Sequence, residues 1–263
     1  MTPPVTDDPW GDWRRFTPAR LALGRAGAGM PTDETLRFGW AHAMARDAIH
    51  AALDTGRLAA ALQADGWRTE TVRSQAPDRA AYLRRPDLGR RLDSDDAARL
   101  HGLGRRAEVC VVVGDGLSSL AVERHAQPLL AALRRHLPPD TGFAPVCIAT
   151  QARVALADET AECFGARLSV MLIGERPGLS SPDSLGIYLT HDPRRGRHDA
   201  ERNCISNVRP QGLAYDSAAF QLAWLMREAL RRGLTGVSLK DESEHSILDA
   251  PAGGTTIAVS KET

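Results

Sequence analysis

The clearest hydrophobic pattern in the chain is a short apolar run that ends in a polar loop. Leu168 to Ile173 is apolar at almost every position and too short for a typical helix, so it predicts a strand buried on both faces. Gly174 to Gly178 then interrupts the run, with a Glu-Arg pair at its tip. Ligands of open α/β sheets bind beyond the carboxyl ends of such strands. The stretch from Leu168 to Pro210 therefore predicts a ligand-binding rim.

Apolar runs and helical periods alternate through the second half of the chain. Val109 to Ser119 is a β-branched run that ends in Gly-Asp-Gly, and a helical pattern follows it. A second run, Phe143 to Ile148, precedes a helical pattern from Val154 to Phe164, and Leu185 to Leu189 predicts a short strand. A final long helix is marked by Leu222, Leu225, Met226, Ala229 and Leu230. The alternation predicts an α/β fold over residues 105–240, with a Rossmann-like, mostly parallel sheet and flanking helices.

The first part of the chain has a different pattern. Residues 1–31 are rich in Pro, Gly and Arg and predict an arm that packs on another surface. Thr32 is the expected N-cap of an amphipathic helix that runs to about Asp54. Residues 32–104 are expected to form a smaller, mainly helical N-terminal domain, and residues 241–263 a poorly ordered tail. The aromatic anchors of the arm are Trp10, Trp13 and Phe16.

The charge balance excludes some classes of partner. The 263 residues include 33 basic and 33 acidic side chains, so the net charge is zero. Without a positive field, neither nucleic acid nor an anionic membrane surface is an expected partner. The four cysteines show no CxxC spacing, which favours a reducing cytoplasm. No leader-like segment and no apolar stretch near the roughly 20 residues of a membrane span is found in the sequence, so we expect a soluble protein that is not exported.

One motif suggests phosphate binding. Gly114 to Ser119 is a glycine-rich turn between a predicted strand and a predicted helix, where backbone N–H groups can point at an anion. As a dinucleotide fingerprint it is incomplete, because serine replaces the third glycine and Asp115 would repel a pyrophosphate. A structural turn with a helix cap is the favoured interpretation. A non-catalytic regulatory or interaction module that binds a nucleotide at this turn is the alternative function.

Motifs for autonomous catalysis are missing from the sequence. It contains no GxSxG, GxxxxGK[ST] or HExxH, and its histidines are scattered. Asp199 and Glu201 stand among several arginines, which indicates ion pairs in a loop and not a hydrolytic pair. We therefore expect no catalytic residue and no metal ligand on this chain.

Three residues near the predicted rim allow more than one interpretation. Glu175 follows a buried strand, where it either pairs with Arg176 or faces a ligand as a hydrogen-bond acceptor. Cys204, taken alone, is more typical of a small buried hydrophobe than of a contact residue. Val154, taken alone, is typical of a core position.

Eight blocks of sequence, in order, closely resemble the small (light) subunit of ethanolamine ammonia-lyase, a bacterial adenosylcobalamin-dependent enzyme. They are TPARLALGRAGAGMPT (17–32), FGWAHAMARDAIH (38–50), DRAAYLRRPDLGRRL (78–92), VVVGDGLSS (111–119), QARVALADE (151–159), IGERPGLSSPDSLG (173–186), DAERNCISNVRP (199–210) and GLTGVSLKD (233–241). The first 16 residues and the tail after Asp241 lie outside the resemblance.

The resemblance implies a subunit that is inactive alone. In the family, a TIM-barrel large subunit carries the substrate chemistry, and adenosylcobalamin (coenzyme B12) lies between the subunits of a higher hetero-oligomer. That enzyme converts ethanolamine to acetaldehyde and ammonia by radical chemistry. The family's cobalamin contacts fall on Val154, Glu175 and Cys204 of this sequence. The resemblance further implies a cytoplasmic protein, with packaging in a bacterial microcompartment as a finer expectation.

The chemistry of the three residues agrees with this implication. Glu175 can accept a hydrogen bond from a corrin amide, Val154 can pack against the macrocycle, and Cys204 is short enough to let the backbone approach. The sequence lacks DxHxxG, the signature of cobalamin proteins that supply a histidine to cobalt, so no histidine is expected to be a cobalt ligand. A protein that kept the fold and lost cobalamin is a third hypothesis.

Overall fold

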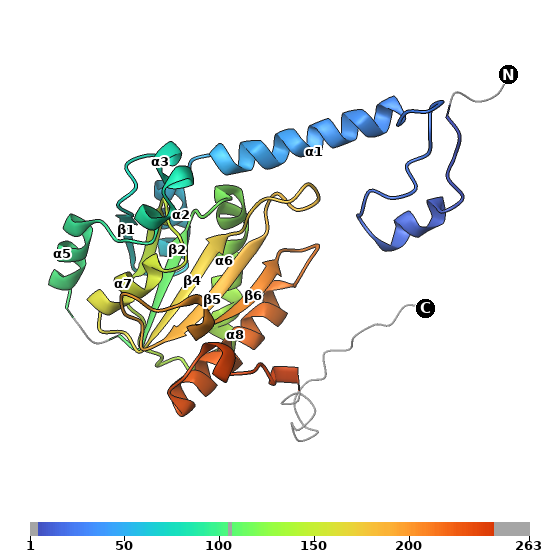
Figure 1. Cartoon of the computed structure of the whole chain (residues 1–263). Coiled ribbons are helices and arrows are strands. Elements are labelled where there is room, and N and C mark those ends of the chain that lie inside the picture. Colours follow the sequence, from blue (N-terminus) through green and yellow to red (C-terminus); the bar gives the residue numbers. More distant parts are fainter. Residues whose placement is uncertain (1–4, 105–106, 245–263) are drawn as a thin grey trace.

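The alternation of strands and helices builds one sheet with helices on both faces (Figure 1). The structure is a computed structural model, and it describes residues 5–104 and 107–244. The predicted α/β class is confirmed. The predicted tail falls almost wholly outside the described residues.

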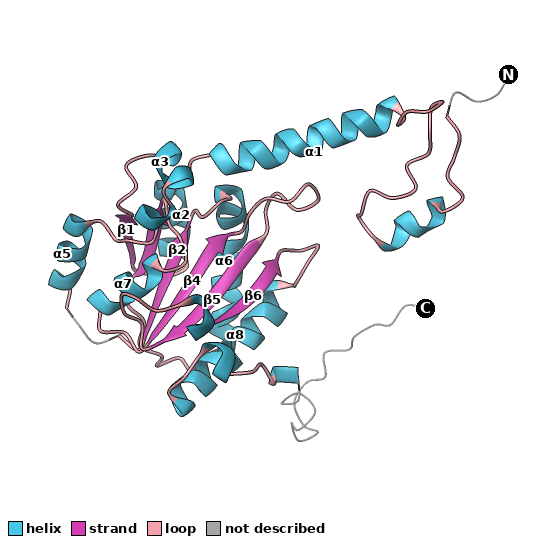
Figure 2. Cartoon of the chain, in the orientation of Figure 1, coloured by secondary structure: helices cyan, strands magenta, loops and turns pink. Residues whose placement is uncertain are grey.

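Six strands form the sheet in the order β1-β3-β2-β4-β5-β6. They are β1 (Thr69–Arg73), β2 (Val109–Gly114), β3 (Val146–Thr150), β4 (Leu168–Gly174), β5 (Leu185–His191) and β6 (Arg202–Val208). Strands β1, β3, β2 and β4 are parallel, whereas β5 runs antiparallel to both β4 and β6 (Figure 2). The sheet is therefore mixed. The loop 175–184 explains the first reversal, because it is too short for the crossover that a parallel pair needs.

The main helices flank this sheet. They are α1 (Thr32–His50), α2 (Thr55–Ala64), α3 (Arg79–Arg84), α4 (Pro86–Gly89), α5 (Ser94–Gly102), α6 (Ser119–His136), α7 (Leu156–Cys163) and α8 (Tyr215–Arg232). Short 3-10 helices are η1 (Gly11–Phe16), η2 (Asp199–Glu201) and η3 (Gly236–Ser238).

Strand β2 shows how the sheet divides its side chains between two cores. Val109, Val111 and Val113 pack on one face with residues of α2, α6 and α8. Cys110 and Val112 pack on the other face with residues of α5 and α7. Every residue of β2 is buried, and so is every residue of β4. Both strands therefore lack the polar alternation of a half-exposed strand, as their sequences predicted.

Strand β1 lies in the part of the chain that was expected to be mainly helical. It pairs with β3 along its whole length, so residues 32–104 supply an edge strand to the same sheet. Val72 is its only buried residue, and a single apolar side chain gives no detectable period. The rest of this region contains the helices α2, α3, α4 and α5.

The predicted first helix differs from α1 at both ends. Thr32 is the first helical residue and not the cap, since Pro31 occupies the N-cap position without a side-chain hydrogen bond. The helix ends at His50, and Asp54 instead caps α2 by accepting a 2.9 Å bond from the Arg57 N–H. The apolar spacing of α1 does not continue to Asp54, because Asp54 serves as the cap of the next helix.

Helix α1 leaves its apolar residues largely uncovered. Figure 1 shows the helix extending past the sheet, with the N-terminal arm at its far end. Leu36 is 67% exposed and Trp40 is 70% exposed. Their spacing of four residues places both on one face of the helix. Trp10, Trp13 and Phe16 of the arm are exposed as well. The N-terminal half of this apolar face, at Leu36 and Trp40, is therefore largely uncovered within the described residues.

Candidate functional site

The candidate site begins where β4 ends. Gly116, in the turn after β2, has a φ of +56°, and a Cβ there would collide with the carbonyl oxygen of Gly174. The Leu117 N–H donates a 2.9 Å hydrogen bond to that same oxygen. This contact holds the carboxyl ends of β2 and β4 together. Glu175 is the next residue, and its N–H bonds to the Ser184 carbonyl at 2.9 Å across the base of the loop 175–184.

The far end of this loop is anchored to α6. The Ser118 hydroxyl donates to the Pro182 carbonyl at 2.7 Å, and the Arg124 guanidinium donates to the Asp183 carboxylate at 2.7 Å. The same Ser118 hydroxyl accepts a bond from the Ala121 N–H and so caps α6. The loop that carries Glu175 is therefore held at both ends.

The Glu175 carboxylate points across β5 towards β6. It accepts hydrogen bonds from the hydroxyls of Ser184 and Ser206, and one of 3.3 Å from the Asn207 N–H. A Cβ on Gly186 would lie 3.0 Å from its Oε1, so glycine leaves room for this path. No ion pair joins Glu175 to the exposed Arg176 in the described part of the chain. Of the two alternatives for Glu175, the pairing with Arg176 is not found among the described residues, and residues distant in sequence orient the carboxylate.

Cys204 lies opposite Tyr188 on adjacent strands, and the two side chains form a hydrogen bond. Cys204 is exposed, so the interpretation of this residue as a buried hydrophobe is wrong. Partial burial raises the pKa of its thiol, an effect that the Tyr188 hydrogen bond opposes in part. Burial also raises the pKa of Tyr188, and the nearby Cys204 and Glu175 add to this. Both groups are therefore protonated at neutral pH.

Val154 lies in the turn that precedes α7 and is half-buried. It packs against the core between α7 and the sheet, and so does Tyr188. The expectation that Val154 contributes to a core is thus correct for part of its surface.

We call the α7 side of β5 and β6 the open face, defined by Tyr188, Cys204 and Ser206, with Glu175 at its edge. Of the three residues that the sequence singled out, Glu175 and Cys204 lie near Tyr188 and both act on its pKa, whereas Val154 packs against the core on the same side of the sheet. Sequence reasoning missed Ser184, Tyr188 and Ser206. The signal for Ser206 was its spacing of two from Cys204, which places both on one face of a strand.

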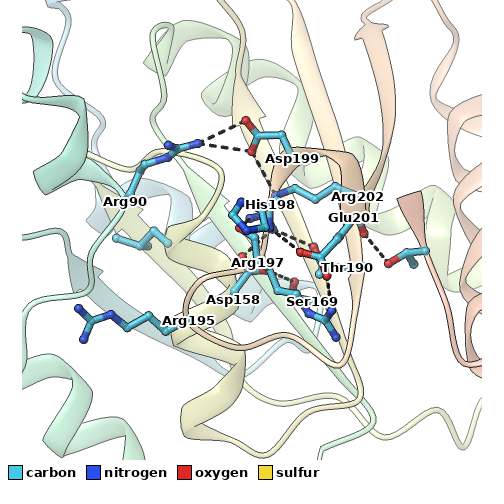
Figure 3. Close-up of polar contacts among 12 residues, drawn as sticks. Arg90, Asp158, Ser169, Thr190, Arg195, Arg197, His198, Asp199, Glu201 and Arg202 are labelled. Atoms are coloured by element: carbon cyan, nitrogen blue, oxygen red, sulfur yellow. Dashed lines mark hydrogen bonds and ion pairs between the residues drawn. The ribbon is translucent and has the colours of Figure 1, made fainter. Parts of the chain in front are cut away.

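An internal ion pair fixes β6 beside the open face (Figure 3). Arg202 and Asp158 are each 2% exposed at the side chain and lie 2.5 Å apart. The Arg202 guanidinium also donates to the Thr190 hydroxyl at 3.0 Å, and the Ser169 hydroxyl donates to Asp158 at 3.2 Å. Burial raises the pKa of Asp158, and Arg202 opposes that rise. These contacts join α7 to the strand that carries Cys204.

The acidic residues of η2 form ion pairs, as expected. Asp199 lies 3.3 Å from the Arg90 guanidinium, and Glu201 pairs with Arg197 (Figure 3). Neither carboxylate is placed for hydrolytic chemistry, because each is directed at an arginine.

The turn from Gly114 to Ser119 has little room for a phosphate. A Cβ on Gly114 would lie 2.5 Å from the Met171 Cε and 2.9 Å from the Ala152 Cβ. The N–H groups of Asp115, Leu117 and Ser118 already bond to backbone carbonyls of the chain. A P-loop-like site needs such N–H groups to be free for the anion. This geometry favours the structural turn over the nucleotide site.

Within residues 5–104 and 107–244, no group of three His, Cys, Asp or Glu side chains could hold a metal ion. No helix in the same ranges is both long and apolar enough to cross a membrane.

Cys204 provides a chemical test of this geometry. Its alkylation by iodoacetamide should be slow near pH 8 and should reach half its maximal rate only above the ordinary thiol pKa of about 8.5, because burial raises its pKa. Tyr188→Phe removes the hydrogen bond that lowers this pKa and should shift the profile to still higher pH. Mass spectrometry of labelled peptides distinguishes Cys204 from the buried Cys110 and Cys147. An apparent pKa equal to that of free cysteine would contradict the geometry.

Fold and site together define the class of this protein: an α/β protein with a mixed six-stranded sheet, whose open face offers acceptor and apolar groups beside the carboxyl end of β4. The family described as "Ethanolamine ammonia-lyase light chain (EutC)" matches residues 7–240. The chain belongs to this family.

Relatives with the printed name "Ethanolamine ammonia-lyase small subunit" match nearly the whole chain. The one from Azotobacter vinelandii is 55% identical over 258 residues, which cover 95% of each chain. The one from Ralstonia nicotianae is 53% identical over 251 residues, covering 94% of this chain and 93% of the relative. The one from Xanthomonas campestris pv. campestris is 52% identical over 257 residues, covering 94% of each.

Proposed function

We propose that this chain is the small subunit of an adenosylcobalamin-dependent ethanolamine ammonia-lyase, and that its open face holds the cofactor against a TIM-barrel large subunit. The observation that carries the proposal is that Glu175 and Cys204 lie near Tyr188 on the open face of a chain of this family, with Val154 packed on the same side of the sheet. The complex would convert ethanolamine to acetaldehyde and ammonia. The broader assignment, a subunit of an ammonia-lyase, follows from membership of the family.

The residues of the open face fit a corrinoid. The Glu175 Oε1 accepts a bond from Ser206, and a carboxylate oxygen has capacity for a second donor. Corrin amides are such donors. The protonated Cys204 thiol and the half-exposed Tyr188 place no negative charge against the macrocycle, and Val154 adds apolar contact area. When bound, the cofactor supplies a radical by homolysis of its cobalt–carbon bond, while this chain orients and encloses it.

The partner would contact the arm and α1. Most of the exposed large apolar side chains lie between residues 10 and 40, and such patches typically mark protein interfaces. The arm also reaches the candidate site, because the Arg20 guanidinium donates a 3.3 Å bond to the Leu179 carbonyl in the loop 175–184. A large subunit held by α1 would therefore lie close to the Glu175 loop.

Several finer expectations belong to this proposal. The parallel part of the sheet supports a Rossmann-like arrangement over residues 105–240, with residues 32–104 as an N-terminal unit that also lends β1. The resemblance supports a cytoplasmic hetero-oligomer packaged in a bacterial microcompartment. These remain predictions of the proposal.

Co-expression tests the proposal directly. We expect ethanolamine deamination only when this chain, a large subunit and adenosylcobalamin are all present. Trp40→Glu places a charge on the exposed face of α1 and should reduce recovery of the two-subunit complex by at least about tenfold, since buried aromatic anchors dominate interfaces. Arg46→Glu is a matched control on the exposed part of the same helix. Deamination by the large subunit alone, at the rate of the pair, would refute the proposal.

A further inference from the structure

The turn after β2 holds a carboxylate that the proposed function does not use. Asp115 is only 4% exposed, and burial raises its pKa above the ordinary value for aspartate. A buried carboxylate is costly unless other groups donate hydrogen bonds to it. Its donors therefore indicate what the residue does.

Two of these donors belong to the loop between β3 and α7. The Gln151 N–H donates to Asp115 Oδ2 at 2.9 Å, and the Ala152 N–H donates to Oδ1 at 2.9 Å. Gln151 has a φ of +55°, in the left-handed region that residues other than glycine seldom adopt. This conformation is unfavourable for a residue that has a Cβ. The two hydrogen bonds to one carboxylate hold the loop in this unfavourable conformation.

Residues of α3 and α4 hold the rest of the loop by hydrogen bonds. Burial raises the pKa of Tyr82 to about 12, so its phenol keeps the proton and donates to the Ala152 carbonyl at 3.0 Å. The Arg153 N–H donates to the Gly89 carbonyl at 2.8 Å, and the Arg153 guanidinium stacks on the Tyr82 ring, 4.3 Å from its centroid. The backbone is therefore fixed at each of the three residues before Val154.

Asp115 has a third partner that leads to α1. The Arg79 guanidinium lies 3.3 Å from Asp115 Oδ2 through Nη1, and its Nε donates to the Ile49 carbonyl at 2.7 Å. Ile49 belongs to the last turn of α1. The carboxylate thus contacts both the loop that precedes Val154 and, through Arg79, the helix that is exposed for a partner.

We propose that Asp115 is a positioning residue, which sets the place of Val154 by holding the N–H groups of Gln151 and Ala152. This inference rests on the proposed function, in which Val154 contacts a corrinoid. Asp115 itself touches no cofactor in this role. The motif that resembles a phosphate-binding turn thus orders a neighbouring loop, and its aspartate is required for that purpose.

The test compares Asp115→Asn with a matched control, Asp216→Asn. Asparagine keeps the size of the side chain and loses one of the two acceptors that the loop needs. Asp216 accepts from Arg135 at 2.9 Å and His136 at 3.1 Å on the opposite side of the sheet, so its substitution removes similar bonds without touching the loop. Tyr82→Phe is a second variant, which removes the donor to Ala152 and retains Asp115.

Two readouts are used. Hydrogen exchange of the chain should become faster at residues 151–155 in Asp115→Asn, by about tenfold, because local opening of that loop is easier. The dissociation constant of the two-subunit complex for adenosylcobalamin, measured by equilibrium dialysis, should rise about tenfold, as substitutions behind contact residues commonly do. The turnover rate at saturating cofactor should change less than about twofold, since the chemistry is elsewhere. Tyr82→Phe should shift both readouts in the same direction.

The outcomes separate the positioning role of Asp115 from the proposed function of the chain. Faster exchange and weaker binding in Asp115→Asn and Tyr82→Phe, with neither in Asp216→Asn, supports positioning. Unchanged exchange at residues 151–155 in both variants overturns it, and so does unchanged affinity when Glu175→Ala weakens binding. If cofactor affinity responds to neither Glu175→Ala nor Val154→Ala, the proposed function fails, and the exchange readout alone then decides whether Asp115 holds the loop.

Discussion

Glu175→Ala should weaken the binding of adenosylcobalamin to the two-subunit complex by about 10- to 100-fold. The basis is the loss of a hydrogen bond to a charged acceptor, worth roughly 1.5–3 kcal/mol. The variant should still fold, because Ser206 and Asn207, two of the carboxylate's donors, are exposed and can bond to water instead. Optical titration of the complex with the cofactor measures the affinity, and circular dichroism confirms the fold.

Arg176→Ala is the matched control for this prediction. Arg176 is the next residue, is exposed and forms no ion pair with Glu175 in the described part of the chain. We expect the complex that contains Arg176→Ala to bind the cofactor with the affinity of the wild type. If Glu175→Ala also binds normally, the carboxylate only fastens β6 to the loop 175–184, and Glu175 has no role as a ligand-facing acceptor.

Arg202→Met should lower the free energy of unfolding by about 3–5 kcal/mol, because it leaves a buried carboxylate without its partner. Asp158 and Arg202 are each 2% exposed, so water cannot replace the lost guanidinium without opening the structure. Adding Asp158→Leu removes the uncompensated charge and should recover at least about half of the loss. Urea unfolding of the two variants and the wild type measures both effects.

The pH dependence of Arg202→Met has a defined sign. Burial raises the pKa of Asp158, and loss of Arg202 removes the main opposing effect. The folded variant then binds a proton more tightly than the unfolded chain, so its stability falls as pH rises through that raised pKa. The penalty relative to the wild type should therefore shrink as the pH falls through that raised pKa. A penalty that does not change with pH would contradict this account. Arg231→Met is the control, because Arg231 is exposed and pairs with Glu228. An equally large loss of stability in that variant would also contradict the account.

The sequence predicted the middle of the sheet well and its edges poorly. Strands β2 and β4 are continuous apolar runs, and burial on both faces is the only environment that suits them. Strand β6 was not predicted because Ile205 and Val208 are its only apolar buried residues. Its first residue, Arg202, is buried against Asp158, and that contact joins residues far apart in sequence.

For the candidate residues, the sequence predicted local position but not the contacts between distant residues. That Glu175 follows a buried strand was clear from the apolar run before it, and so was the loop that bears it. Which residues bond to it was not clear, because the nearest charge in sequence, Arg176, is exposed and Ser206 comes from another strand. Cys204 was expected to be buried, and it is exposed on β6, which is an edge strand of the sheet.

By itself, the sequence determined the α/β class, the strand that leads to Glu175, the apolar face of α1 and the membership of the chain in its family. These follow from local order: runs of apolar residues, helical spacing and matched blocks along one chain. Only the tertiary structure decided that Glu175 and Cys204 lie near Tyr188, that β5 and β6 run antiparallel to one another, and that the Asp115 carboxylate accepts hydrogen bonds from the loop before α7. The physical reason is that hydrogen bonds and burial join residues by distance in space, which the order of residues does not record.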